Sequence, residues 1–185
     1  MESKFFTIFP SPFQTFTIIW IKKNNRVLVQ RIFLSDPEKK SEAKAHDAFQ
    51  NIKQNTSSLI DSIGNKIQEF LTGRAQKFDQ YLLDFSICSP IQKKVLEAEA
   101  KISRGWISTY KRIARAINHP KSARVVGNAL AKNPFPSIIP CHRAIKSNGE
   151  IGGFQGGSKM KRKLLELEGI RFTNNGKVLI DKIYY

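Results

Sequence analysis

The first 90 residues alternate between short apolar segments and polar turns. Phe13–Trp20 and Arg26–Leu34 show the apolar–polar alternation that is typical of strands. Between them, residues 22–25 (KKNN) include two asparagines, which tolerate the positive φ angles of a tight hairpin turn. Tyr81–Ile87 predicts one more strand.

A helical pattern separates these predicted strands. Ser35-Asp36-Pro37 opens the helix-rich stretch, and Leu59–Leu71 is its clearest helix, with Gly73 as the stop. The apolar positions at three- and four-residue spacing are Ile60, Ile63, Ile67, Phe70 and Leu71. Residues 1–84 are therefore expected to form a strand-and-helix domain that ends shortly before the change of composition at Ser89-Pro90.

From Pro90 onward the pattern is helical. Ile91–Ile102 is amphipathic, and Gly105 breaks it. Ser158–Glu168 predicts another helix, which Gly169 ends. Its inward positions are expected at Met160, Leu164 and Leu167, and its outward positions at Lys159, Lys161, Arg162 and Lys163.

Two short helices between these segments have the outline of a helix-turn-helix. Thr109 can cap the first helix, residues 118–121 (NHPK) form a turn, and Ser122 can cap the second helix. Arg124 lies in the first turn of that second helix. Any corner between two helices has a similar pattern, so the motif alone indicates DNA binding only weakly.

The charge strengthens this interpretation. The chain has 185 residues and a net charge of +16. Residues 1–85 carry 12 Lys and Arg against 9 Asp and Glu, whereas residues 86–185 carry 19 against 6. This asymmetry favours a polyanionic partner for the second half, nucleic acid first and an anionic membrane surface second. The alternative is that the excess charge only keeps the protein soluble.

Composition excludes several other classes of protein. A hydrophobic fraction of 41%, with 13 Phe, is too high for a disordered basic tail. Two cysteines, Cys88 and Cys141, exclude a disulfide scaffold and a zinc site made of cysteines alone. The sequence has no apolar run long enough to span a membrane and no basic leader at its start, so we expect a soluble intracellular protein.

The segment from Asn133 to Arg143 carries the candidate chemistry. An apolar run leads through a proline into adjacent Cys141, His142 and Arg143. A thiol attacks as its thiolate, and nearby imidazole or guanidinium groups lower its pKa. The alternative is that Cys141 is a small core residue, which is the favoured reading for Cys88.

Two further features follow downstream. Residues 152–157 (GGFQGG) form a loop whose glycines let the backbone approach a ligand closely, although a flexible connector has the same composition. Glu168 lies in the last turn of its helix, where the helix dipole disfavours an anion. It either orients a partner such as a histidine or is a solvated carboxylate.

Together these residues resemble the O6-alkylguanine-DNA alkyltransferase family, also called methylated-DNA–protein-cysteine methyltransferases. The resemblance rests on the segment PCHR at residues 140–143 and covers about residues 85–170. The other matching segments are Thr109-Tyr110, residues 123–127 (ARVVG), Asn133-Pro134, the glycine loop and residues 164–169 (LLELEG).

The resemblance implies a direct-reversal DNA repair protein of single turnover. Cys141 would accept the alkyl group irreversibly, and His142 would deprotonate it through a water, with Glu168 orienting the histidine. Tyr110 would donate a proton to the departing guanine and crowd the adjacent phosphate. Arg124 would enter the base stack in place of the flipped nucleotide.

The remaining site residues have supporting roles in this resemblance. Asn133 would brace the turn before the acceptor, and Arg143 would add positive charge beside it. Small side chains would let the second helix of the motif approach the minor groove. The residues implied in DNA binding are Thr109, Tyr110, Ala123, Arg124 and Gly127, and those implied over the flipped base are Phe154, Gln155 and Gly156.

The resemblance also implies the fold class, the partner and the location. We expect an α+β protein with a ribonuclease H-like domain over residues 1–84, a winged-helix-like domain over residues 85–170 and a tail over residues 171–185. Asn174-Asn175-Gly176 gives that tail a possible hairpin turn. The expected partner is double-stranded DNA containing O6-alkylguanine, bound by a monomer in the cytoplasm, or in the nucleus of a eukaryote.

Departures from the family pattern affect substrate breadth and metal binding. Ala144 stands where Val is common, and Phe154 and Gln155 replace the more usual Tyr and Ser, so the accepted size of alkyl group stays open. Some members hold a structural zinc through N-terminal Cys and His. Residues 1–84 contain no Cys and only His46, so we expect no metal and no cofactor.

Two other functions stay open from the sequence. One is a non-catalytic binder of alkylated DNA, although such alkyltransferase-like proteins lack the acceptor cysteine. The other is a transcription regulator that uses the helix-turn-helix, although no effector domain is evident.

Overall fold

The computed structural model describes residues 3–185, which form two compact units. The first unit contains the residues up to Ile87 together with Pro134–Ile138, and the second contains Cys88–Asn133 and Ile139–Tyr185. The protein has mixed α+β structure, with a small sheet in the first unit, as the sequence predicts. Among residues 3–185, every helix is too short or too polar to cross a membrane.

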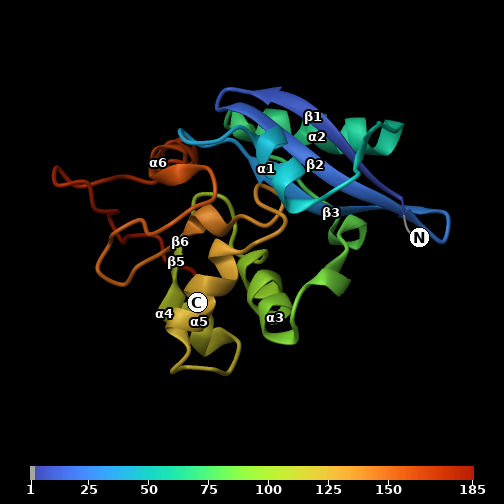
Figure 1. Ribbon diagram of the computed structural model, residues 1–185. Coiled ribbons are helices and arrows are strands. Elements are labelled where there is room, and N and C mark those ends of the chain that lie inside the picture. The colour runs from blue at the N-terminus through green and yellow to red at the C-terminus, as the bar shows by residue number, and fades with distance from the viewer. Residues whose placement is uncertain (1–2) are drawn as a thin grey trace. The chain divides into compact units, whose positions relative to one another are not determined.

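The first unit is built on a four-stranded sheet with the order β3-β2-β1-β4. Figure 1 labels β1, β2 and β3 of this sheet. β1, β2 and β3 are successive antiparallel strands, and β4 lies parallel to β1. The predicted hairpin is confirmed: Asn24 and Asn25 have φ angles of 48° and 59° in the turn between β2 and β3. The strand bounds are Lys4–Ser11 for β1, Gln14–Lys23 for β2, Arg26–Leu34 for β3 and Lys53–Gln54 for β4.

β1 was not expected from the sequence. Pro10 interrupts its apolar run, and prolines are rare inside sheets because they cannot donate a ladder hydrogen bond. Here Pro10 lies at the penultimate position of the strand, opposite Thr15, where the chain is about to turn. The strand therefore keeps its pairing over Lys4–Ser11.

Two helices cover opposite faces of this sheet. α1 (Ser41–Ala48) packs through Ala45 on a cluster that includes Phe6 and Ile19. α2 (Ser58–Leu71) packs on the other face, where Gly64 leaves room for the ring of Phe9. All five predicted apolar positions of α2 are buried, so the helix predicted over Leu59–Leu71 is confirmed.

The strand predicted over Tyr81–Ile87 is wrong. The segment forms two 3₁₀ turns, η1 (Gln80–Leu82) and η2 (Phe85–Ile87), and only Leu83 makes a strand-like bridge, to Val29. The cause is local, because the Asp84 carboxylate accepts hydrogen bonds from the backbone and the hydroxyl group of Ser86. Such bonds from a side chain to the nearby backbone favour a turn over a strand.

The second unit contains four helices (Figure 1). Ser89 and Thr109 accept capping hydrogen bonds at the starts of α3 and α4, as Thr109 was predicted to do. Ser122 stands at the N-cap of α5, but its side chain makes no capping bond, so that part of the prediction is wrong. The helix bounds are Pro90–Glu99 for α3, Tyr110–Ala116 for α4, Ala123–Ala131 for α5 and Gly157–Leu167 for α6.

A short parallel pair of strands joins the helices to the candidate site. β5 (Ser108–Thr109) immediately precedes α4, and β6 (Ala144–Ile145) immediately follows the 3₁₀ turn η3 (Cys141–Arg143). The tail 171–185 belongs to this unit and lies beside Ile107, which bridges Ile183. β5 and β6 thus place the start of α4 next to the turn that carries the cysteine.

Candidate active site

Cys141 begins the turn η3 and is 6% exposed. Its backbone N–H donates to the carbonyl oxygen of Ile139 at 2.8 Å. Burial raises the pKa of the thiol to about 11, although a hydrogen bond with the Asn133 side chain opposes the shift. Neighbouring cations were expected to lower this pKa; Lys161 does so, but burial outweighs it. The resting form of Cys141 is therefore the thiol.

His142 and Arg143 both bind the carboxylate of Glu168, which caps the end of α6. The Nε2 atom of His142 lies 3.0 Å from Oε1 of Glu168. Arg143 donates to the same carboxylate through Nε at 2.8 Å and Nη2 at 2.7 Å. Of the two readings of Glu168 that the sequence left open, the structure excludes the solvated carboxylate, because its side chain is 2% exposed.

Burial and hydrogen bonding shift the pKa values of Glu168 and His142 in opposite directions. Burial raises the pKa of Glu168, but hydrogen bonds from His142 and Arg143 outweigh it and hold the value at about 2. For His142, burial lowers the pKa, while the bond to Glu168 opposes that shift. At neutral pH a neutral imidazole therefore faces a carboxylate, and this imidazole can accept a proton.

Tyr110, the first residue of α4, lies against the glycine loop. Gly152 has a φ angle of +70°, and a Cβ atom at this position would collide with the Tyr110 hydroxyl group. Burial raises the pKa of Tyr110 to about 12, with the charges of Glu99 and Cys141 adding to the shift. The phenol therefore keeps its proton at neutral pH and can serve as a donor.

The rest of the glycine loop contacts His142 and Met160. The ring of Phe154 makes an edge contact with the ring of His142, with centroids 6.3 Å apart. Gly156 is buried, and a Cβ atom on it would collide with Met160, while Gln155 is half-buried. Within this loop, Gly152 and Gly156 make close approaches that a side chain would block.

Lys161 was predicted to point outward from α6, and this is wrong. Its side chain is fully buried. Nζ donates to the carbonyl oxygen of Ala144 at 2.7 Å and to that of Gly153 at 3.3 Å, so the ammonium group joins β6 to the glycine loop. It also lies 6.0 Å from the centroid of the Tyr110 ring. Burial lowers the pKa of Lys161 to about 8.

Glu99, at the end of α3, is a second residue that the sequence analysis missed. Its side chain is fully buried in the same neighbourhood, where its charge influences Cys141 and Tyr110. A sequence signal existed, since Glu99 follows Val95 by four residues and Leu96 by three and so shares their apolar face.

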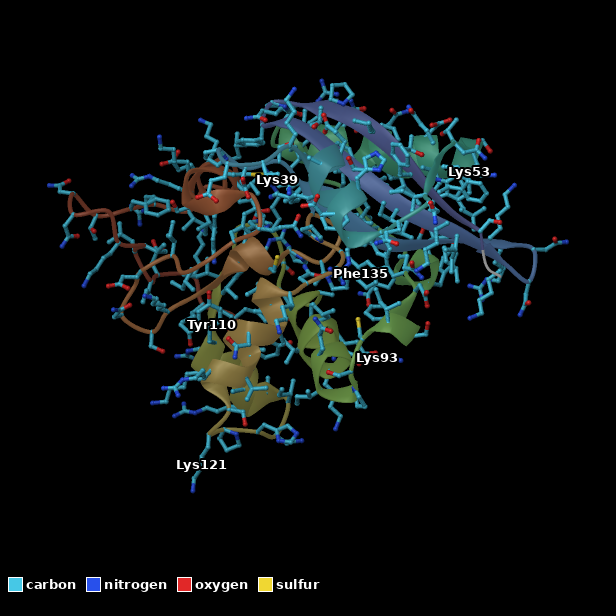
Figure 2. The ribbon with its side chains drawn as sticks, in the orientation of Figure 1. Lys39, Lys53, Lys93, Tyr110, Lys121 and Phe135 are labelled. Carbon is cyan, nitrogen blue, oxygen red and sulfur yellow. The ribbon has the colours of Figure 1, made fainter. Side chains whose placement is uncertain are left out.

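Three of the residues implied in DNA binding, Ala123, Arg124 and Gly127, lie on α5. Arg124 is exposed on α5, Ala123 is half-buried, and Gly127 has open space where a Cβ would stand. Lys121, in the turn before α5, projects away from the fold (Figure 2). The structure does not bring these side chains into the buried group around Cys141, and it leaves them accessible to a partner.

The two remaining predicted residues support the backbone. Thr109 caps α4 by accepting a hydrogen bond from the N–H of Arg112 at 3.2 Å. Asn133 donates through Nδ2 to the carbonyl oxygen of Ile139 at 3.1 Å. That bond closes the segment that leads to Cys141.

Comparison with known proteins points to one family. A family model described as "6-O-methylguanine DNA methyltransferase, DNA binding domain" matches residues 90–170. Methylated-DNA–protein-cysteine methyltransferase from Methanothermobacter thermautotrophicus is 47% identical over 113 residues, and the match covers 60% of this chain and 60% of that protein. The protein of the same name from Haemophilus influenzae is 33% identical over 124 residues, covering 67% of this chain and 69% of the relative.

Solved structures agree over most of the chain. The Mycobacterium tuberculosis protein OGT, solved in complex with DNA, has a TM-score of 0.68 at 25% identity and covers 88% of this chain and 91% of its own. O6-methylguanine-DNA methyltransferase from Pyrococcus kodakaraensis has a TM-score of 0.67 at 26% identity, covering 90% and 99%. Cys141 is buried and a histidine follows it, and both the family model and the relatives match this part of the chain. The chain therefore belongs to the methylated-DNA–protein-cysteine methyltransferase family.

Proposed function

We propose that this protein repairs O6-alkylguanine in DNA by transferring the alkyl group to its own Cys141. The observation that carries the proposal is the buried turn η3, in which Cys141 precedes a histidine that is bound to the Glu168 carboxylate. A thiol, a histidine and a carboxylate that orients the histidine are the groups used in nucleophilic catalysis, which supports the proposal. The names of the relatives support the same activity.

The proposed reaction conserves atoms, protons and electron pairs. The thiol proton of Cys141 passes to His142 through a water, and the resulting thiolate attacks the alkyl carbon. A sulfur–carbon bond forms, the bond between that carbon and guanine O6 breaks, and its electron pair remains on the guanine. Tyr110 donates a proton to the leaving guanine, and the proton held by His142 restores the phenol. The products are guanine and an alkylated cysteine, so each molecule reacts once.

Double-stranded DNA is the proposed partner, bound through the minor groove. The alkylated oxygen lies within the duplex, so the nucleotide must be flipped out before sulfur can reach it. Arg124 on the exposed surface of α5 is suited to fill the vacated place in the stack. Small side chains at Ala123 and Gly127 allow the close approach that a narrow groove requires. We infer that a monomer acts, in the compartment that holds the DNA.

We also propose finer assignments for the two domains. Three antiparallel strands followed by a parallel fourth, with helices on both faces, support a ribonuclease H-like scaffold for the N-terminal domain. The α4–α5 pair beside the short β5–β6 strands supports a winged-helix-like DNA-binding domain over residues 85–170. The tail 171–185 completes that domain with a hairpin, in which Phe172 bridges Val178.

The test is a transfer experiment with mapped products. The protein is incubated with duplex DNA that carries a labelled methyl group on guanine O6, and the label is located by mass spectrometry. We expect one label per molecule on Cys141, none on Cys88, unchanged transfer in Cys88→Ser and no transfer in Cys141→Ser. Binding of the damaged duplex without transfer would instead identify a lesion marker, and equal binding of undamaged DNA without transfer would favour a regulator.

A further inference from the structure

Glu99 is a buried acid that the proposed reaction does not use. It is the last residue of α3, its side chain is 0% exposed, and neither carboxylate oxygen accepts a hydrogen bond within residues 3–185. A buried carboxylate without donors is strongly disfavoured, and the C-terminal end of a helix adds a further unfavourable field. Both effects favour the neutral carboxylic acid.

Charged and titratable groups from four other segments face Glu99. They are Lys161 on α6, Arg143 and Cys141 in η3, Tyr110 on α4 and Tyr185 in the tail. The two cations differ, because Arg143 is already neutralised by the bidentate contact with Glu168. Among residues 3–185, the ammonium group of Lys161 donates to the carbonyl oxygens of Ala144 and Gly153 and has no bonded carboxylate partner.

The geometry assigns to Glu99 the role of a positioning residue for the acceptor: as a neutral acid it leaves the charge of Lys161 uncancelled beside Cys141, and as an anion it cancels that charge. This inference extends the proposed function, since it concerns how readily the same cysteine becomes a thiolate. Glu99 acts through the local field and touches neither substrate nor the reacting atoms.

The direction of the effect follows from the charges. Burial raises the pKa of Glu99 to about 8, with the charges of Lys161 and Arg143 opposing the shift, so the acid is largely neutral at pH 7. Above that value Glu99 becomes an anion whose charge raises the pKa of Cys141, and Lys161, whose pKa is also about 8, loses the charge that lowers it. The thiolate of Cys141 should therefore increase less steeply with pH than an isolated thiol would.

The test measures the reactivity of Cys141 without DNA, so that its result is independent of the repair activity. Iodoacetamide is reacted with the full chain between pH 6.5 and 9.5, and the modified cysteines are quantified by mass spectrometry with Cys88 as the internal reference. The variants are Glu99→Gln and, as a matched control on the same helix, Glu97→Gln, whose side chain is exposed.

We expect Glu99→Gln to react at the rate of the unaltered protein at pH 6.5, within about twofold, and about three- to tenfold faster at pH 9.5, which corresponds to a pKa shift of up to one unit. Glu97→Gln should follow the unaltered protein throughout. A Glu99→Gln rate that differs by the same factor at every pH would indicate a merely structural role and overturn the inference, as would a slower rate at pH 9.5.

A second measurement covers the case in which Glu99→Gln does not fold. In the unaltered protein with ¹³Cδ-labelled glutamate, one carboxyl resonance should titrate between pH 7 and 9, far above the range of exposed glutamates. If every glutamate resonance has completed its titration below pH 6, Glu99 is an anion at neutral pH and the inference is wrong. Failure of methyl transfer to Cys141 with this titration intact would count against the repair function alone.

Discussion

The Nε2 atom of His142 lies 3.0 Å from Oε1 of Glu168, with both side chains almost completely buried. Since Arg143 donates to both oxygens of the same carboxylate, Glu168 is fixed in position and kept ionised. The histidine therefore has one ring nitrogen committed to a carboxylate. Two predictions rest on this contact between His142 and Glu168.

Glu168→Gln should slow alkyl transfer by about 10²- to 10³-fold, because an amide neither fixes the histidine tautomer nor stabilises the imidazolium that forms. Single-turnover rates with alkylated duplex DNA measure the effect. Glu166→Gln is the control, since Glu166 is exposed on the same helix and accepts a hydrogen bond from Arg162. Equal rates for the two variants would contradict the proposed role of Glu168.

The same carboxylate should contribute to the acid stability of the protein. The pKa of Glu168 is about 2 in the folded state, below its ordinary value of 4.5. A lowered pKa gives stability that is complete above pH 4.5 and is lost as the pH falls toward 2. The contribution is about 3 kcal/mol at neutral pH. Urea unfolding between pH 2 and 7 should show a steeper acid loss for the unaltered protein than for Glu168→Gln.

Gly152→Ala should impair the site, whereas Gly153→Ala should not. An added Cβ at Gly152 collides with the Tyr110 hydroxyl group and requires a φ angle of +70°, while Gly153 has open space around it. We expect a loss of about 1–3 kcal/mol in unfolding free energy for Gly152→Ala and less than about 1 kcal/mol for Gly153→Ala. Thermal and chemical unfolding provide the comparison.

Adding Tyr110→Phe to Gly152→Ala should restore part of the lost stability, because the colliding oxygen is removed. If the double variant is no more stable than Gly152→Ala alone, the collision with the hydroxyl group is not the cause of the loss.

Arg124→Ala should slow repair of duplex DNA much more than reaction with the free alkylated guanine base, because only the duplex requires base flipping. Arg115→Ala removes an exposed cation from the neighbouring helix α4 and serves as the control for lost charge. Rates for both substrates are measured under single-turnover conditions. An equal loss on the free base and the duplex would assign Arg124 to the acceptor chemistry instead.

Affinity for undamaged duplex DNA should fall steeply with salt. Each phosphate that the basic C-terminal half neutralises should contribute a slope of about −0.9 to a plot of log affinity against log salt concentration. Arg124→Ala and Lys121→Ala should each reduce that slope by about one unit where the residue contacts a phosphate. A flat salt response would remove the electrostatic argument for DNA as the partner.

Local chemistry made much of the fold predictable. Asn24 and Asn25 accept positive φ angles, so the hairpin could be placed from two residues. The turn around Asp84 was missed because side-chain hydrogen bonds within the turn override the apolar pattern. β1 was missed because Pro10 interrupts its apolar run, and the ladder to β2 cannot be seen in the pattern of β1 alone.

The site was predictable to the extent that its residues are adjacent in the sequence. Cys141, His142 and Arg143 are consecutive, and Glu168 was singled out by its position at a helix end. Lys161 and Glu99 were missed because charged residues are expected at the surface, and only tertiary packing supplies the carbonyl oxygens that hold Lys161 inside. Charge on an apolar helix face is the signal that identifies both.

The segment Pro134–Ile138 belongs to the N-terminal unit, although the residues on either side of it belong to the other unit. Phe135 is fully buried there against the ring of Phe85, and the N–H of Ile32 donates to the carbonyl oxygen of Pro134 at 2.7 Å. A truncated chain that began at Cys88 would lack both of these partners and would expose Phe135 six residues before the acceptor cysteine. The N-terminal unit is therefore discontinuous in the sequence, and a single cut before Cys88 would separate Pro134–Ile138 from the rest of the unit to which it belongs.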